Sequence, residues 1–591
     1  MKTKGVGASA GIGIGKVVKI HTSKPDLSTI VVESEREELA RFEKGSKKFI
    51  QKMQHLSAKT EKKLGKEHAA IFDSQIMLLK DEELQEKVRE AIAKGSSASQ
   101  AVYDVTQYYA QKLAKVDNPF IRQRAADALE LQEGMIKILF GMQDTSGLKQ
   151  TEPTILVLDE LTPTIAAQLD TTYIVGIVTE KGGFYGHALI LARQMAVPVI
   201  FGKKNAMSVI PDGSLLAIDG ISGELEWNPP KKALARWREK EQDWLRHQDL
   251  LSSFRTKPSV GRDGRSYQIM ANINSVEEAG MAAEIGADGI GLFRTEFLFL
   301  ERTKIPSEEE QFQAYLQVSE LMKDKPVTIR TLDVGGDKPI SYLHLPVEAN
   351  PYLGYRAIRY GLEHPGEFKI QLRAILRAGA QHRNLSIMIP FITSVEEVRK
   401  TKELVEECKK ELREQGIAFD ENCRLGIMIE TPSAALMARE LAQEVSFFSI
   451  GTNDLTQYVL SCDRSNASVA GIYSAFQPAV LRAIGMTIEA ANEAGIEVSM
   501  CGEAAASAPM IAILSGWGLT RLSVGLNSVW YVRERVTNVT KEEGQQLARK
   551  VSVARTHQEV MDIVKNKKST MILDKTEQNK ENEENGYVEN L

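Results

Sequence analysis

Short apolar runs recur through the second half of the chain, and most of them give way to a polar or reactive side chain. Six runs end at such a residue or directly before it: Asn272, Arg294, Arg330, Glu430, Asp454 and Cys501. Two further runs, LSIMIPF at 385–391 and RLSV at 521–524, bring the number to eight. Continuous apolar runs of this length indicate strands that are buried on both faces, as in a parallel sheet.

Stretches with helical periodicity separate these runs, for example SVEEVRKTKELVEECKKELREQG and PAVLRAIGMTIEAANEAG. Eight strands that alternate with helices over about 300 residues predict a (β/α)8 barrel of the TIM type, whose active site lies at the carboxyl ends of the strands. An open doubly wound sheet is the alternative, because spacing along the chain does not reveal strand order. The barrel would bring the polar residues that end the runs around one mouth.

The first half of the chain has a different pattern. Long heptad-like segments with no proline before Pro119 predict a bundle of about four helices. Short strands with glycine turns lie on both sides of it, so the bundle is an insertion into an α/β domain. The predicted organisation is an α/β domain at 1–32 and 148–228, a helical insertion at 33–147, a helical linker at 229–257, a barrel at 258–570 and a disordered tail at 571–591.

Composition narrows the class of protein. Hydrophobic residues at 43%, charged residues at 26% and a net charge of −5 are typical of a soluble protein and give no sign of a nucleic-acid partner. The four cysteines follow no metal-binding spacing, which favours a reducing compartment. The start of the chain lacks the apolar core of a signal peptide, and no stretch has the length of a membrane helix. We therefore expect a cytoplasmic protein with no membrane insertion.

Two glycine clusters are candidates for anion sites, and the sequence supports only the second. The first, Gly5 to Gly15, contains the letters of a dinucleotide fingerprint, but the following KVVKI reads as a strand where the fingerprint needs a helix. The second, KGGFYGHALILAR at 181–193, puts His187 at the start of an apolar helix, where backbone N–H groups would stabilise a phosphate carried on the imidazole. The alternative for a lone histidine is a helix cap or an ordinary surface residue.

The strand-end residues of the barrel suit a small phosphorylated anion. Arginine grips phosphate or carboxylate in two places at once, and the candidates are Arg294, Arg330, Arg356 and Arg464. Glu430 and Asp454 offer oxygen ligands for Mg²⁺, and Asn453 offers an amide to substrate oxygens. The alternative is salt bridges between these carboxylates and the arginines.

Cys501, in SMCGEAA, is a candidate acid or base where an enolate forms. The more common role for a thiol at such a position is that of a buried, inert residue.

Together these segments resemble enzyme I of the bacterial phosphotransferase sugar-uptake system, the phosphoenolpyruvate-protein phosphotransferase family. The similar stretches, from Gly5 to about residue 570, include GLFRTEFLFLER at 291–302, RTLDVGGDKP at 330–339, NPYLGYRAIRYGL at 350–362, LGIMIETPSAALMA at 425–438, SIGTNDLTQY at 449–458 and CGEAA at 501–505. Several long motifs in one order make a chance match very improbable.

The resemblance implies roles for the candidates. His187 would take the phosphoryl group of phosphoenolpyruvate and pass it to a histidine-containing phosphocarrier protein docked on the helical insertion, while Cys501 protonates the enolpyruvate. Phosphoenolpyruvate would be bound by Arg294, Arg330, Asn453, Asp454 and Arg464, with Arg356 a weaker candidate, and Mg²⁺ by Glu430 and Asp454. The resemblance also implies an α/β domain that swivels between barrel and carrier, and a homodimer through the barrel.

Several positions depart from the family pattern. The family usually reads Gly-Gly-Arg-Thr-Ser-His, whereas Phe184, Tyr185 and Gly186 precede His187 here. Gln75 replaces a histidine of the helical segment, and Ser465 and Gly471–Ile472 replace a glycine and a His-Leu pair. These changes bear on carrier phosphorylation more than on phosphoenolpyruvate binding.

Two other functions compete with this interpretation. One is a phosphoenolpyruvate-binding regulatory or scaffold paralogue with weak or no carrier phosphorylation, for which the altered flank of His187 is the only support. The other is a pyruvate-phosphate dikinase or phosphoenolpyruvate synthase. That class needs a nucleotide-binding domain of some 200 residues, for which the helical segment is too short and too helical.

Overall fold

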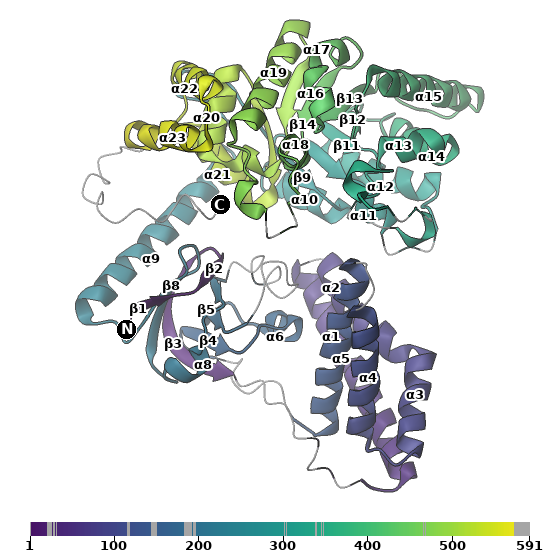
Figure 1. The fold of residues 1–591 in the computed structure, drawn as a ribbon, viewed down its shortest axis with the longest axis vertical. Coiled ribbons are helices and arrows are strands. Elements are labelled where there is room, and N and C mark those ends of the chain that lie inside the picture. The colour runs from purple at the N-terminus through teal and green to yellow at the C-terminus, as the bar shows by residue number, and fades with distance from the viewer. Residues whose placement is uncertain are drawn as a thin grey trace. The chain divides into compact units, whose positions relative to one another are not determined.

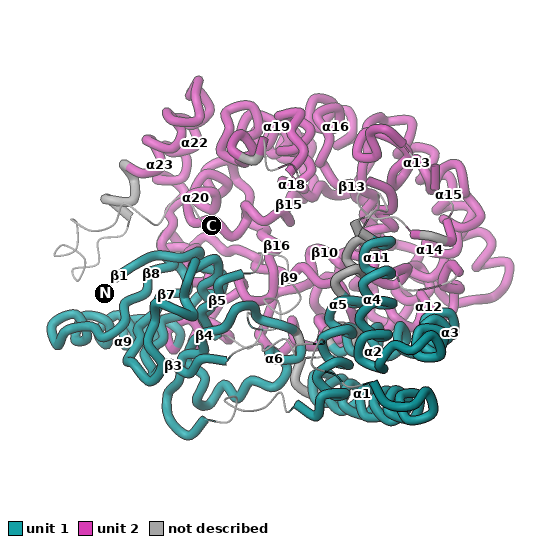
Figure 2. Tube along the Cα trace, turned by 60° about the horizontal axis from the view of Figure 1, so that its bottom comes forward, with its two compact units in different colours: residues 1–248 teal, residues 249–591 magenta. Residues whose placement is uncertain are grey.

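The structure is a computed structural model, and it forms two compact units, residues 1–248 and 249–591 (Figure 2). The residues that it describes are 2–20, 27, 30, 32–64, 66–114, 119–142, 150–181, 192, 197–300, 302, 304–336, 340–343, 345–346, 348–464, 466 and 469–571. His187 with its flank, Ser465 and all but the first residue of the expected tail at 571–591 lie outside them.

The first unit contains a mixed eight-stranded sheet with the order β1-β8-β7-β3-β4-β5-β6-β2. Strands β3 to β6 are parallel, and the remaining pairs are antiparallel. The strands are β1 (Lys2–Lys4), β2 (Val6–Ser9), β3 (Ile12–Ile20), β4 (Thr154–Leu158), β5 (Ile174–Thr179), β6 (Val199–Phe201), β7 (Leu215–Asp219) and β8 (Glu224–Trp227). Two short helices, α6 (Pro163–Gln168) and α8 (Ala206–Val209), belong to the same part of the chain.

The first glycine cluster takes part in the pairing of this sheet. A Cβ added at Gly13 would lie 2.1 Å from the carbonyl oxygen of Val175, and one at Gly15 would lie 2.7 Å from that of Pro153. These glycines therefore allow close approach of backbone segments, as expected for a strand and not for a nucleotide loop.

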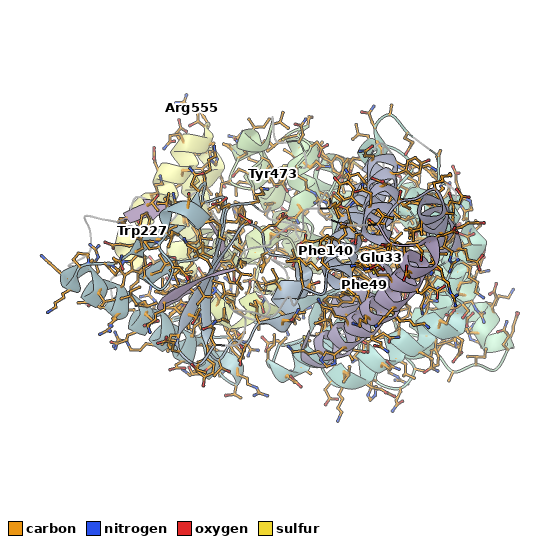
Figure 3. The ribbon with its side chains drawn as sticks, turned by 90° about the horizontal axis from the view of Figure 1, so that it is seen from below. Glu33, Phe49, Phe140, Trp227, Tyr473 and Arg555 are labelled. Atoms are coloured by element: carbon orange, nitrogen blue, oxygen red, sulfur yellow. The ribbon has the colours of Figure 1, made fainter. Side chains whose placement is uncertain are left out.

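Between β3 and β4 the chain forms a helical bundle, so the insertion into the α/β domain is confirmed as part of the fold class. The described residues form five helices where the pattern predicts about four: α1 (Glu35–Leu64), α2 (Lys66–Lys80), α3 (Glu82–Ala93), α4 (Ala98–Ala114) and α5 (Pro119–Leu139). The extra break has a local cause, because the Asp81 side chain accepts the N–H of Leu84 and starts α3. Phe49, labelled in Figure 3, is one of the buried rings of the bundle.

One buried polar pair joins two helices of the bundle. Gln75 of α2 donates to the carboxyl group of Glu130 of α5 at 2.8 Å. Burial, together with the negative charges of Asp127, Glu133 and Glu160, raises the pKa of Glu130 to about 8. Gln75, one of the departures from the family pattern, thus contacts a carboxyl group that is largely protonated at neutral pH.

The expected linker is a helix, α9 (Lys231–Ser252), and its first half packs on the sheet of the first unit. Trp237 is buried and donates its indole N–H to Glu226 at 2.9 Å. Lys240 pairs with the fully buried Asp219 at 2.5 Å. Residues 231–240 are therefore tied to the α/β sheet by two polar contacts.

The second unit is a closed barrel of eight parallel strands (Figure 1). Strand β9 pairs with both β10 and β16, which closes the sheet and excludes the open doubly wound alternative. The strands are β9 (Gln268–Ile273), β10 (Ile290–Arg294), β11 (Val327–Arg330), β12 (Leu385–Ile389), β13 (Arg424–Ile429), β14 (Phe447–Ile450), β15 (Glu497–Met500) and β16 (Arg521–Gly525). All eight strands predicted from the apolar runs are confirmed.

Helices surround this barrel and cover the outer faces of its strands. Their bounds are α10 (Val276–Glu284), α11 (Glu296–Phe299), α12 (Glu308–Met322), α13 (Ile358–Glu363), α14 (Pro365–Ala378), α15 (Val395–Glu414), α16 (Pro432–Leu436), α17 (Ala438–Leu441), α18 (Thr452–Val459), α19 (Pro478–Ala494), α20 (Ala508–Trp517), α21 (Val529–Val536), α22 (Lys541–Val553) and α23 (His557–Met571). Throughout the described part of the chain, no helix has both the length and the hydrophobicity needed to cross a membrane.

Candidate active site

The strand-end candidates lie at one edge of the barrel. Arg294 and Arg330 are the last residues of β10 and β11, while Glu430 and Cys501 directly follow β13 and β15. Carboxyl ends of parallel strands meet at one mouth, so the fold brings these four side chains to the same end. Asn453 and Asp454 differ slightly from expectation: they lie in the first turn of α18, not at the end of β14 itself. Arg464 follows that helix.

Oppositely charged side chains alternate through this mouth. Arg330 pairs with Glu296 at 2.8 Å and with Asp333 at 3.4 Å. Asp333 in turn accepts two hydrogen bonds from Arg356, both at 2.9 Å, in a bidentate pair. Arg356 then reaches Asp454 at 3.1 Å. Each of these five side chains is buried, so the network excludes most of the surrounding water.

The far end of the network is more open. Arg464 lies 3.9 Å from the second oxygen of Asp454, and about a third of its side chain is exposed. Asp454 is therefore held by two arginines. For this carboxylate, the structure shows the salt bridges that the sequence analysis gave as the alternative to metal binding. Burial alone would lower the pKa of Arg330, but the surrounding carboxylates raise it, so its charge is secure.

Glu430 is held differently. One of its oxygens accepts the backbone N–H of Phe391 at 2.7 Å. The other lies beside Gly451, where an added Cβ would come within 3.0 Å of it, so a larger residue there would crowd the carboxylate. Burial and the negative charges of Asp454 and Asp333 raise the pKa of Glu430 to about 7, against the opposing effect of Arg330 and Arg356.

The negative charges that raise the pKa of Glu430 would be offset by a divalent cation bound beside this carboxyl group. In the part of the chain that the structure describes, no group of three His, Cys, Asp or Glu side chains is arranged to hold a metal ion. The prediction that Glu430 and Asp454 bind a metal therefore requires a substrate and water to supply the other ligands.

Cys501 lies in the barrel interior. Its thiol is buried and donates weakly to the carbonyl oxygen of Ile450 at 3.7 Å. Burial raises the pKa of this thiol, and the opposing effect of nearby Arg330 and Arg294 does not cancel it, so the group carries its proton at neutral pH. The next residue must be glycine, because a Cβ at Gly502 would lie 1.7 Å from the hydroxyl oxygen of Thr452.

Asn453 lies at the rim of the mouth. The hydroxyl group of Tyr473, labelled in Figure 3, donates to its backbone carbonyl at 3.0 Å. The amide of Asn453 reaches Glu503 at 3.5 Å, a long contact that leaves the side chain easy to redirect. Burial raises the pKa of Tyr473 to about 12, although Arg464 beside it acts in the opposite direction.

Two members of the network, Glu296 and Asp333, are not among the residues singled out from the sequence. Glu296 lies two positions after Arg294, and Asp333 three positions after Arg330, within the motifs GLFRTEFLFLER and RTLDVGGDKP. An acidic residue this close to a strand-end arginine is a usable signal, because both face the same mouth. His187 lies outside the described residues, so its role stays a prediction.

Comparisons with known proteins agree with this architecture. Residues 4–124 match the N-terminal region of the PEP-utilising enzymes, residues 150–223 their mobile domain and residues 248–541 their PEP-binding domain, where PEP is phosphoenolpyruvate. The phosphoenolpyruvate-protein phosphotransferase of Bacillus subtilis is 36% identical over 565 residues, which cover 95% of this chain and 99% of the relative. That of Haemophilus influenzae is 38% identical and covers 92% of this chain and 95% of the relative. The family resemblance read from the motifs is confirmed, and the chain belongs to the family of the phosphoenolpyruvate-protein phosphotransferases.

Proposed function

We propose that this chain transfers the phosphoryl group of phosphoenolpyruvate to its own His187 and then to a histidine-containing phosphocarrier protein, releasing pyruvate, as the first step of sugar uptake and phosphorylation. The observation that carries the proposal is the gathering of Arg330, Glu430, Asp454 and Cys501 at one mouth of a closed parallel barrel. Cations for a dianion, oxygen ligands for a metal and a protonated thiol are the groups that this reaction requires.

In this proposal the arginines neutralise the charge of phosphoenolpyruvate. Arg294 and Arg464 are partly exposed and can turn toward an incoming phosphate or carboxylate, whereas Arg330 is fixed by its carboxylate partners. Asn453 donates to substrate oxygens, since its contact with Glu503 is long. Asp454 lies between Arg356 and Arg464. It would contact the substrate from α18, the helix that also carries Asn453.

Glu430 and Asp454 would hold Mg²⁺, and the raised pKa of Glu430 supports this assignment. When bound, the metal supplies positive charge against the phosphoryl oxygens. For Asp454 to act as a ligand it must share its carboxylate with the arginines that hold it. We expect the two carboxylates to bind the metal on their own and the substrate to complete the ligand set, so that Mg²⁺ binds more tightly when phosphoenolpyruvate is present.

The proposed chemistry needs few protein groups. An imidazole nitrogen of His187 forms the new P–N bond as the bond from phosphorus to the enol oxygen breaks, and the electron pair remains on that oxygen. The enolate then takes a proton at its methylene carbon from the Cys501 thiol and becomes pyruvate. The thiol regains its proton from solvent, and the raised pKa of Cys501 ensures that it holds a proton to give.

The remaining assignments rest on membership of the family. The helical insertion would dock the carrier protein, and the α/β domain would swivel to bring His187 to the barrel mouth and to the carrier in turn. We also propose a homodimer through the barrel and a cytoplasmic location. The relatives' names do not favour the scaffold alternative, because they describe phosphotransferases.

The test is incubation of the full chain with phosphoenolpyruvate labelled on phosphorus, in the presence of Mg²⁺. The expected result is an acid-labile, base-stable label on the wild type and none on His187→Ala. Transfer of that label to a general sugar-system carrier protein would then test the altered flank of His187 directly. Absence of label on the wild type would refute the proposal and favour a scaffold.

A further inference from the structure

Phe391 lies just beyond β12 in a backbone conformation that its side chain does not favour, with a φ of +59°. Among the described residues, seven other than glycine have a positive φ, and five of them are exposed polar residues of ordinary turns: Asn205, Asn228, Lys323, Arg383 and Ser461. The two buried ones are Ala357, which follows Arg356, and Phe391. Strained backbone of this kind persists only where the surrounding structure enforces it, often at functional sites.

The backbone of Phe391 makes one contact with the site. Its N–H donates to one oxygen of Glu430 at 2.7 Å, the same hydrogen bond that orients this carboxylate. The second oxygen is left beside Gly451, next to the start of α18, which carries Asp454. The φ of Phe391 describes the bond that follows this N–H, so it sets the direction of the ring and of the following chain relative to the donor that Glu430 accepts.

The ring of Phe391 makes the other contacts. The guanidinium carbon of Arg356 lies 4.9 Å from the ring centroid, and that of Arg359 lies 5.0 Å from it. The ring of Tyr458 meets Phe391 edge-on, with centroids 5.7 Å apart. Tyr458 also accepts a hydrogen bond from Arg356 at 2.9 Å. The edges of the Arg356 guanidinium are used by Asp333, Asp454 and Tyr458, and its face is used by Phe391.

We propose that Phe391 is a positioning residue of the active site, which fixes Glu430 through its backbone N–H and fixes Arg356, and with it Asp454, through its ring. One residue outside the substrate contacts would then set the separation of the two carboxylates. The inference rests on the proposed function in so far as these carboxylates are metal ligands. Replacing a residue that orients a metal ligand typically costs about 10–100-fold in metal affinity or activity.

The test uses the full chain and two substitutions at the same position. Phe391→Leu keeps an apolar side chain but removes the ring, and Phe391→Tyr keeps the ring. The matched control is Phe254→Leu, which removes another buried ring of the same unit, one that stacks with Lys257. The measurements are the Kd of Mn²⁺ alone by electron paramagnetic resonance, kcat/KM for labelling by phosphoenolpyruvate, and the melting temperature.

For Phe391→Leu we expect the Mn²⁺ Kd to rise and kcat/KM to fall, each by about tenfold, the lower end of what such partners contribute. Phe391→Tyr should keep the wild-type Mn²⁺ Kd and kcat/KM, because it retains the ring that contacts Arg356. Phe254→Leu should lower the melting temperature while its Mn²⁺ Kd stays at the wild-type value.

Three results would overturn the inference: unchanged Mn²⁺ affinity in Phe391→Leu, an equal loss in Phe391→Tyr, or an equal loss in Phe254→Leu. A wild type without measurable Mn²⁺ affinity would also overturn it, since no ligand pair would then be positioned. A wild type that binds Mn²⁺ but takes no label would refute the proposed function instead. The Mn²⁺ comparison among the variants would still decide the role of Phe391.

Discussion

Replacing Glu430 by glutamine should make the barrel more stable at alkaline pH while it removes activity. The Glu430 side chain is buried, and burial together with Asp454 and Asp333 raises its pKa to about 7 from an ordinary value of 4.5. At pH 8 the carboxyl group is therefore ionised in a setting that disfavours the charge. Glutamine has the same shape, can still accept the Phe391 N–H and carries no charge.

The magnitude follows from the shift in pKa. A difference of about 2.5 units at 1.36 kcal/mol per unit corresponds to about 3 kcal/mol. Between pH 4.5 and pH 7 the folded wild type holds a proton that the unfolded chain has released, so its free energy of unfolding falls as pH rises. This contribution is fully lost above pH 7. The advantage of Glu430→Gln should therefore grow from about 1 kcal/mol at pH 5 to about 3 kcal/mol at pH 8.

Differential scanning calorimetry of the full chain, with a chelator present, measures this effect. An unfolding entropy of about 2 cal/mol/K per residue over roughly 320 residues converts 3 kcal/mol into a rise of about 4–5 °C in the barrel transition. Excess Mg²⁺ should stabilise the wild type more than the variant, because only the wild type offers both carboxylates. The reasoning is refuted if Glu430→Gln is less stable at pH 8, or if its advantage is the same at pH 5.

Four further substitutions test other parts of the structure. Arg330→Ala removes the buried ion pairs of Arg330 with Glu296 and Asp333, although Asp333 keeps Arg356, and should destabilise the barrel by about 3–5 kcal/mol. Arg294 is partly exposed, so Arg294→Ala should abolish the label with a melting temperature near that of the wild type. Equal melting temperatures of the two variants in calorimetry would contradict this. Cys501→Ala should take up label yet release pyruvate slowly in a coupled assay, and unchanged release would exclude Cys501 as the proton donor. Glu130→Gln should stabilise the helical bundle at pH 9 but not at pH 5. The pKa of Glu130 is about 8, so at pH 9 the wild type carries an unfavourable buried charge that glutamine lacks. A free energy of unfolding of the wild-type bundle that does not change with pH in chemical denaturation would rule this out.

The sequence was sufficient for the barrel because each strand is a short apolar run with a distinct end. Arg294 and Arg330 mark two of these ends, and both are the final residues of their strands. The bundle was harder to divide, since α1 to α3 form a nearly continuous helical pattern and only the cap at Asp81 separates the last two. Helical periodicity alone does not show where one helix stops and the next begins.

The sequence indicated several residues of the mouth, but it missed Glu296 and Asp333 and did not show how the side chains pair. The ends of continuous apolar runs pointed to Glu430 and Asp454, yet they could not show that Asp454 is shared by two arginines while Glu430 receives a backbone N–H. The left-handed backbone of Phe391 has no signal in sequence, because phenylalanine ordinarily continues a strand. Pairing and backbone conformation depend on tertiary contacts, which a one-dimensional pattern does not contain.

The alternating order Glu296, Arg330, Asp333, Arg356, Asp454 has a consequence for selectivity. Arg330 and Arg356 already pair with carboxylates of the same chain. Because these carboxylates are part of the protein, they compete with any external anion at a high effective concentration. Chloride or free phosphate would have to displace such a carboxylate from its arginine, and the net free energy of binding would be small. A ligand that binds together with its own counter-cation gives the displaced carboxylate a new partner, so the mouth discriminates by charge balance as well as by shape.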